Sequence, residues 1–97
     1  MNLGMAIKSV RKQKGLKQNE FAKICDITQA YLSQIESNNK EPNLSTLKKI
    51  AEKLEIPLPI LFFMSIDEND ISPEKDEAFK MISPSIKALI NQFFVTP

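Results

Sequence analysis

Residues 16–36, LKQNEFAKICDITQAYLSQIE, constrain the fold of this chain more than any other stretch. Apolar residues at helical spacing predict a short helix over residues 18–25 with one buried face. Asp26 and Ile27 then form a tight corner before the next helical pattern begins. The residues that define the buried face of this first helix are Phe21, Ala22 and Cys25.

The second helix of this stretch is predicted over residues 29–36, with Thr28 as its N-cap. Leu32 and Ile35 face the core, whereas the opposite face is uncharged and able to form hydrogen bonds. A short helix, a corner and a helix with a small polar outer face form the helix-turn-helix arrangement that reads the major groove of DNA. The outer-face residues are Gln29, Ala30, Ser33 and Gln34.

These features resemble those of the lambda-repressor/Cro-type family of helix-turn-helix regulators, also called the XRE family. The resemblance covers roughly residues 3–62 and implies an all-α fold. We expect a five-helix DNA-binding domain over residues 1–66 and a C-terminal helical extension over residues 67–97. The resemblance also implies a transcriptional regulator, most simply a repressor, that binds double-stranded DNA as a homodimer at a palindromic operator. The motifs that carry it are Gly15-Leu16-Lys17-Gln18, Phe21-Ala22, Thr28-Gln29, Tyr31-Leu32-Ser33-Gln34-Ile35-Glu36, Pro42 and Leu47 to Leu54.

The charge distribution is uneven along the chain. Residues 1–55 contain ten Lys or Arg and six Asp or Glu, a net charge of +4. Residues 56–97 contain three basic and six acidic residues, a net charge of −3. A basic first half suits a domain that faces DNA, and an acidic second half suits a segment that does not. Ordinary variation of surface charge would also produce this difference. The charge distribution therefore supports DNA binding only together with the helix-turn-helix motif.

The resemblance assigns DNA contacts to the two helices and to the loop that follows them. Base contacts are expected from Gln29, Ala30, Ser33 and Gln34, since a glutamine amide matches N6 and N7 of adenine. Tyr31 suits either packing on the core or contact with DNA, and its place at the edge of the outer face favours the DNA contact. The residues expected to contact phosphate or sugar are Lys17, Gln18, Tyr31, Asn38, Asn39 and Lys40.

Three positions depart from the family pattern. Lys17 stands where Ser, Thr or Asn usually caps the helix, so the first N–H groups lack a side-chain acceptor. Asp26 and Asn38 stand where glycine is usual, and both residue types tolerate the left-handed backbone conformation that these turns require. The family further implies a structural ion pair between Arg11 and Glu36, which locks the first helix of the domain to the reading helix.

Three further helices are predicted around this motif. Residues 3–14 carry an apolar stripe, and Gly15 is well placed to end that helix. Pro57 and Pro59 suit the first turn of a short helix that closes the core. Asn43 caps another helix, whose predicted buried face comprises Leu44, Leu47, Ile50, Ala51 and Leu54.

The extension carries more apolar surface than one small domain needs. Ser72-Pro73 is a helix-start signal, and Ser83-Pro84 repeats it, which predicts two short helices or one kinked helix. The apolar stripe either folds back on its own domain or pairs with its copy in a second subunit, and we expect the pairing. The residues assigned to dimerisation are Phe63, Phe79, Ile82, Ile86, Leu89, Ile90, Phe93 and Phe94.

The chain lacks the residues of common active sites. It has no His, one Cys and two glycines, which leaves no ordinary zinc site, no Cys–His nucleophile and no phosphate-binding loop. No apolar run approaches the ~20 residues of a membrane span, and a single Cys suits a reducing cytoplasm. We therefore expect a cytoplasmic, nucleoid-associated protein of a prokaryote or phage, with no catalytic residue, metal or cofactor and no membrane contact.

Two related functions remain open on the sequence alone. One is an antitoxin whose C-terminal segment binds a partner protein, which an adjacent small toxin gene would favour. The other is a controller of a restriction–modification operon or a phage switch, which shares the DNA-reading chemistry and differs only in its target.

Overall fold

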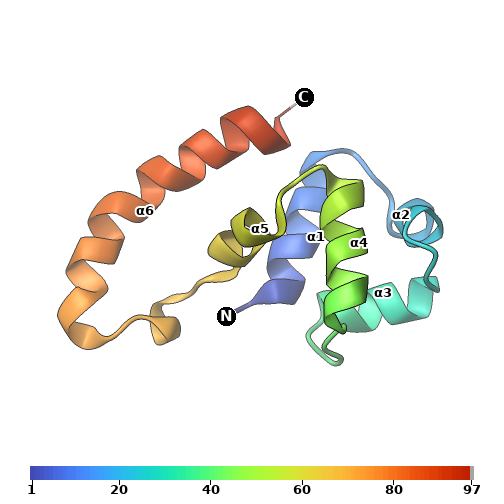
Figure 1. Ribbon diagram of the computed structural model, residues 1–97, viewed down its shortest axis with the longest axis horizontal. Coiled ribbons are helices and arrows are strands. Elements are labelled where there is room, and N and C mark those ends of the chain that lie inside the picture. Colours follow the sequence, from blue (N-terminus) through green and yellow to red (C-terminus); the bar gives the residue numbers. More distant parts are fainter. Residues whose placement is uncertain (97) are drawn as a thin grey trace.

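The computed structural model describes residues 1–96 and shows a helical domain followed by one long C-terminal helix (Figure 1). No β-strand occurs within residues 1–96, so the predicted all-α fold is confirmed. The domain contains α1 (Leu3–Gln13), α2 (Gln18–Ile24), α3 (Gln29–Glu36), α4 (Leu44–Leu54) and α5 (Leu58–Ser65). The extension contains the 3₁₀ turns η1 (Glu68–Asp70) and η2 (Pro73–Lys75), then α6 (Asp76–Ile90) and the π-helical turn η3 (Asn91–Val95).

The tight turns between helices rest on residues with positive φ. Gly15, Asp26 and Asn38 have φ angles of 74°, 57° and 63°, as their positions in the sequence predicted. Asp and Asn are among the few residues with a side chain that adopt this region at small cost. Glu55 ends α4 in the same conformation, at φ 59°, and the sequence contained no signal for it.

The helix starts follow the predicted caps. The side-chain oxygens of Thr28 and Asn43 each accept the backbone N–H three residues further along, at 3.0 and 2.8 Å. Lys17 makes no such bond, so α2 begins without a side-chain cap. Asn2 caps α1 by accepting the backbone N–H of Met5 at 3.0 Å.

The core lies where α1 to α5 meet, and it includes the end of the extension. Leu44 was predicted to be buried, but it is 55% exposed, because the buried face of α4 begins one turn later at Leu47. The buried apolar residues are Ala6, Ile7, Val10, Phe21, Ala22, Cys25, Leu32, Ile35, Leu47, Ile50, Ala51, Leu54, Ile56, Leu61, Ile90 and Val95.

The extension forms one continuous helix rather than two short ones. Pro84 lies inside α6, although proline removes one backbone hydrogen bond and usually ends or bends a helix. Ser83 and Ile90 lie on the buried side of α6 before and after this proline. Of the two predicted alternatives, two short helices are wrong, and a single helix through Pro84 is observed, with a buried residue on each side of the proline.

The C-terminal end of the extension packs back on its own domain. Ile90 and Val95 are 5% and 2% exposed and belong to the core of the domain. The first part of α6 lies further from the domain, at the far side of the molecule from α2 (Figure 1). No helix within residues 1–96 is long and apolar enough to cross a membrane.

Candidate nucleic-acid interface

The outer face of α3 is a row of exposed, uncharged side chains. Leu32 and Ile35 on the inner face are 0% and 1% exposed. Figure 1 shows α3 on the side of the domain away from α6, so the extension does not cover this row. The exposed residues are Gln29, Ala30, Ser33 and Gln34, the four positions predicted for base contacts.

A buried ion pair attaches α3 to α1. The Nε and Nη2 atoms of Arg11 donate to Oε2 and Oε1 of Glu36 at 2.7 and 2.9 Å. The Arg11 and Glu36 side chains are only 6% and 3% exposed. Arg11 Nη1 also donates to the backbone carbonyl of Leu16 at 2.8 Å, which fixes the connection into α2. The predicted structural pair is therefore present, and it joins three segments of the domain.

Gln18 connects the two ends of α3. Its Nε2 donates to Oε1 of Glu36 at 3.1 Å, at the last residue of α3. Its Oε1 accepts Nε2 of Gln29 at 3.3 Å, at the first residue of α3. The exposed Gln29 amide is therefore held in one orientation by Gln18. Gln18 is itself held by Glu36, which pairs with the buried Arg11.

Exposed cations lie before and after the two helices α2 and α3 in the chain. Lys17 precedes α2, and Lys40 lies in the loop after α3; both side chains are exposed, as is that of Asn39. Tyr31 is half-buried and packs against the core, which is the structural role that the sequence allowed. The part of its ring that remains exposed is free to contact DNA.

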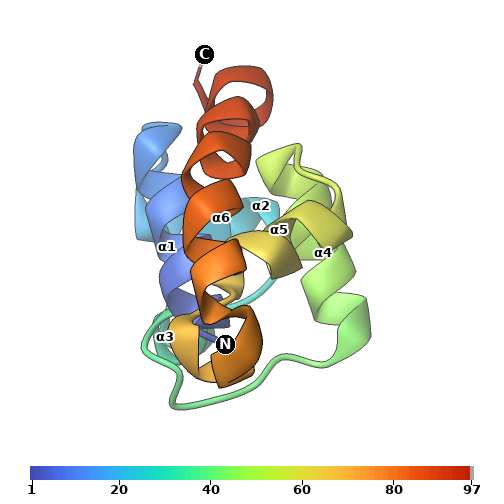
Figure 2. The same cartoon turned by 90° about the vertical axis from the view of Figure 1, so that its left-hand side faces the viewer.

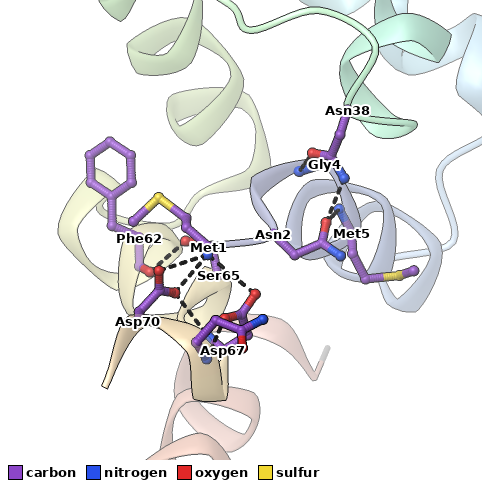
Figure 3. A network of polar contacts seen from close by, with 10 residues as sticks. Met1, Asn2, Gly4, Met5, Asn38, Phe62, Ser65, Asp67 and Asp70 are labelled. Atoms are coloured by element: carbon purple, nitrogen blue, oxygen red, sulfur yellow. Dashed lines mark hydrogen bonds and ion pairs between the residues drawn. The ribbon is translucent and has the colours of Figure 1, made fainter. Parts of the chain in front are cut away.

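Asn38 lies in the same loop, but its side chain points toward α1 (Figure 3). Its Oδ1 accepts the backbone N–H of Gly4 at 3.0 Å, and its Nδ2 donates to Oδ1 of Asn2 at 2.7 Å. The backbone N–H of Asn2 in turn donates to the carbonyl of Ser65 at 2.7 Å. The Asn38 side chain therefore has a structural role that ties the loop after α3 to α1 and α5, and its contact with phosphate stays a prediction.

Gly4 permits this close approach between α1 and the end of α3. A Cβ at Gly4 would lie 2.4 Å from the carbonyl oxygen of Ile35 and 2.6 Å from that of Glu36. Neither Asn2 nor Gly4 was predicted to matter. The available signal was an Asn directly before the first apolar residue of a helix, which is a typical N-cap.

The same network continues to the start of the extension (Figure 3). The Met1 ammonium lies 3.2 Å from Oδ2 of Asp67 and 2.7 Å from Oδ2 of Asp70. Bonding to Asp70 raises the pKa of this ammonium above its ordinary value. Hydrogen bonding from the backbone of Asp67 lowers the pKa of the Asp70 carboxyl. These contacts hold the turn η1 against the beginning of α1.

The residues assigned to dimerisation have three different environments. Ile90 is covered by its own domain and is not available to a second subunit. Phe63 and Ile86 are half-buried against the core, and Phe79 is also half-buried. The exposed members are Ile82, Leu89, Phe93 and Phe94.

The single cysteine is a core residue. Cys25 is 0% exposed, and burial raises the pKa of its thiol to about 11, against the opposing effect of the nearby cations Lys53 and Lys49. In the described part of the chain, no group of three or more Cys, Asp or Glu side chains is placed to hold a metal ion.

A short helix, a left-handed corner and a second helix with an exposed polar face define a helix-turn-helix DNA-binding domain. The helix-turn-helix family model HTH_3 matches residues 7–61. The chain therefore belongs to the XRE-type helix-turn-helix family of DNA-binding transcriptional regulators.

Three curated relatives are similar over much of the chain. Bacillus phage phi105 has two: the ImmF control region 10 kDa protein, 42% identical over 59 residues, and the immunity repressor protein, 29% identical over 97. The matches cover 61% and 88% of this chain and about two thirds of each relative, 66% and 67%. Antitoxin HipB of Escherichia coli K12 is 37% identical over 75 residues, which cover 77% of this chain and 80% of HipB.

A solved structure supports the fold. The crystal structure of the clp gene regulator ClgR from Corynebacterium glutamicum matches with a TM-score of 0.65. The match covers 94% of this chain and 88% of ClgR at 20% identity. The fold is thus shared well beyond the helix-turn-helix motif itself.

Proposed function

We propose that this protein is a cytoplasmic, homodimeric repressor that binds a palindromic operator and places α3 of each subunit in the major groove. The observation that carries the proposal is the orientation of Gln29 through Gln18 and Glu36. An exposed glutamine would ordinarily lose side-chain entropy on binding, and this support removes part of that loss.

Base readout is assigned to the outer face of α3. Gln29 and Gln34 are long enough to hydrogen-bond base edges, and their amides suit N6 and N7 of adenine. Ala30 and the exposed edge of Tyr31 suit the methyl group of thymine. Ser33 has a hydroxyl that can donate or accept, so it adapts to several bases.

Phosphate contacts are assigned to polar groups around α3, of which Gln18 is half-buried and the others are exposed. Lys17 and Lys40 supply charge on the two sides of the groove, and Gln18 and Asn39 supply neutral donors. These contacts position the domain and make its affinity depend on salt, but they do not distinguish sequences.

The domain, over residues 1–66, binds one half-site of the operator. The extension, over residues 67–97, joins the domain to that of a second subunit. Helix-turn-helix dimers read two half-sites about 34 Å apart, or multiples of this spacing, on one side of the duplex. A dimer bound across a promoter prevents access of other proteins to the same DNA. The name of the phage immunity repressor supports repression as the outcome.

The test is the affinity of Gln29→Ala for an operator selected from random DNA, compared with its affinity for unrelated DNA. We expect a loss of about 1–3 kcal/mol on the operator and little change on unrelated DNA. Gln92→Ala, which changes an exposed glutamine in the extension, is the matched control and should change neither affinity. An equal loss on both DNAs for Gln29→Ala would contradict base reading by α3.

A second candidate function is that of an antitoxin. The similarity to antitoxin HipB and the exposed apolar residues of α6 favour it. The experiment is to co-express the chain with any small gene encoded beside it and to measure whether a stable complex forms. The absence of a complex would leave the repressor as the better account.

A further inference from the structure

We infer that two copies of this chain pair through α6 in an antiparallel arrangement, with the twofold axis near Ile86. This inference rests on the proposed homodimer and adds its surface, orientation and register. Figure 2 shows α6 along the outside of the molecule, with no other element in front of it. One side of α6 packs on its own domain, and the pairing concerns an adjacent side.

Apolar residues recur along this adjacent side in alternating steps of three and four. This is the a/d spacing of helices that pack side by side. Ile82 and Leu89 are 55% and 54% exposed, and Phe93, in the turn η3 that continues α6, is 70% exposed. Phe79 and Ile86 are half-buried, and Ile86 packs against the core of the domain. We call these five residues the α6 stripe: Phe79, Ile82, Ile86, Leu89 and Phe93.

The stripe is distinct from the side of α6 that packs on the domain. At about 100° per residue, Ser83 and Ile90 fall together on the buried side, and Ile82 and Leu89 lie roughly a quarter of a turn away from them. Phe79 and Ile86 lie between these two sides, which agrees with their partial burial. The charged residues of α6 fall on the other flank of the buried side, so none of them lies within the stripe. They are Asp76, Glu77, Lys80 and Lys87.

The absence of charge from the stripe is characteristic of the centre of a protein interface. Lys80 instead forms ion pairs within its own chain, at 3.0 Å with Asp76 and 3.9 Å with Glu68. These partners raise the pKa of Lys80, Asp76 being the main cause. The second subunit can therefore cover the stripe without burying an unpaired charge.

The order of side chains in the stripe is self-complementary about its centre. In an antiparallel pair centred on Ile86, Phe79 lies opposite Phe93 of the partner subunit. Ile82 then lies within one residue, a rise of about 1.5 Å, of the level of Leu89 of the partner subunit. The two ends then form aromatic pairs, and the middle forms aliphatic ones. A twofold dimer requires this kind of correspondence, because each contact occurs twice.

The area of the stripe is sufficient for a dimer. Five apolar side chains at roughly 80–100 Å² each contribute about 400 Å² per subunit. With the ~65% apolar content of homodimer interfaces, two subunits then bury about 1,200 Å² in total. Stable interfaces begin near this value, about 1,200–2,000 Å², so we expect a dimer that dissociates on dilution.

Disulfide trapping tests the orientation, because a bond forms only where two Cα atoms approach within about 7 Å. Ile82→Cys and Leu89→Cys are prepared separately and oxidised alone and as a mixture. Antiparallel pairing predicts covalent dimers predominantly in the mixture. Ala88→Cys, on another exposed side of α6, is the control and should not form dimers. Cys25 remains buried and unreactive in all variants.

Sedimentation of the unmodified chain without DNA completes the test, and circular dichroism confirms that each variant is folded. Covalent dimers from either single variant alone would indicate parallel pairing and overturn the inference, while the homodimer proposal would stand. A dimeric mass without any covalent product would move the interface to another surface and also overturn the inference. A monomeric mass at all concentrations would overturn both the pairing and the homodimer.

Discussion

Removal of one partner of the Arg11–Glu36 pair should destabilise the domain strongly. Both side chains are almost fully buried, and two short hydrogen bonds join them. Glu36→Leu leaves the guanidinium of Arg11 in the core with only the carbonyl of Leu16 as a partner. Arg11→Met leaves the carboxylate of Glu36 with only the amide of Gln18.

The magnitude follows from the burial of an unpaired charge. Breaking such a pair on one side costs about 3–5 kcal/mol, whereas replacing both partners by apolar residues is often nearly neutral. In the double variant the Leu16 carbonyl and the Gln18 amide also lose a partner, which adds about 1–2 kcal/mol. A chain of 97 residues has a total stability of about 5–15 kcal/mol, so each single change removes a large part of it.

The assay is urea unfolding followed by far-ultraviolet circular dichroism on both single variants and the double variant Arg11→Met/Glu36→Leu. We expect the double variant to be more stable than either single variant. Lys80→Met, which breaks an exposed pair, is the control and should leave the midpoint unchanged. Losses below about 1 kcal/mol in both single variants would refute the reasoning, because they would show that the buried charges are solvated.

Three further outcomes are expected. Gly4→Ala should lower the stability by about 1–3 kcal/mol in thermal unfolding, since its Cβ would meet two carbonyl oxygens, while Gly15→Ala, in open space at φ 74°, should lose only about 1 kcal/mol. Native Cys25, whose pKa is about 11, should be alkylated at pH 8 only as fast as the domain unfolds; rapid labelling without urea would contradict its burial. Lys40→Ala should reduce the slope of log affinity against log salt by about 1, and an unchanged slope would show that Lys40 does not contact phosphate.

The features that the sequence predicted well are those set by a few neighbouring residues. Gly15, Asp26 and Asn38 lie at turns that need positive φ, and few residue types supply it. Thr28 and Asn43 precede apolar helical patterns, and a cap bonds only to the backbone of its own helix. Such requirements are local, so a single sequence is enough to recognise them.

The orientation of the polar side chains depended on segments far apart in the chain. The helical period alone predicts that Gln29 and Gln34 are exposed. It cannot predict that Asn38 bonds to Gly4 and Asn2, because α1 must first be placed beside the end of α3. The family pattern had assigned Asn38 to DNA, and the packing of α1 also gives its side chain a structural role.

The extension was the least predictable part, because its structure depends on what it packs against. Local rules for Pro84 predict two short helices or one kinked helix and do not choose between them, and the structure has a single helix with Ser83 and Ile90 buried. The apolar pattern also does not distinguish Ile90, which faces its own domain, from Leu89, which remains exposed. Residues of both kinds look alike in a sequence, and only the position of α6 separates them.

Selection of duplexes from a random DNA pool, with the mass of the bound complex measured in solution, tests the central claim most directly. The account predicts an enriched inverted repeat, bound by two chains, whose half-sites lie about one helical turn or a multiple of it apart. Enrichment of a single asymmetric site bound by one chain, or no enrichment over random DNA, would contradict it.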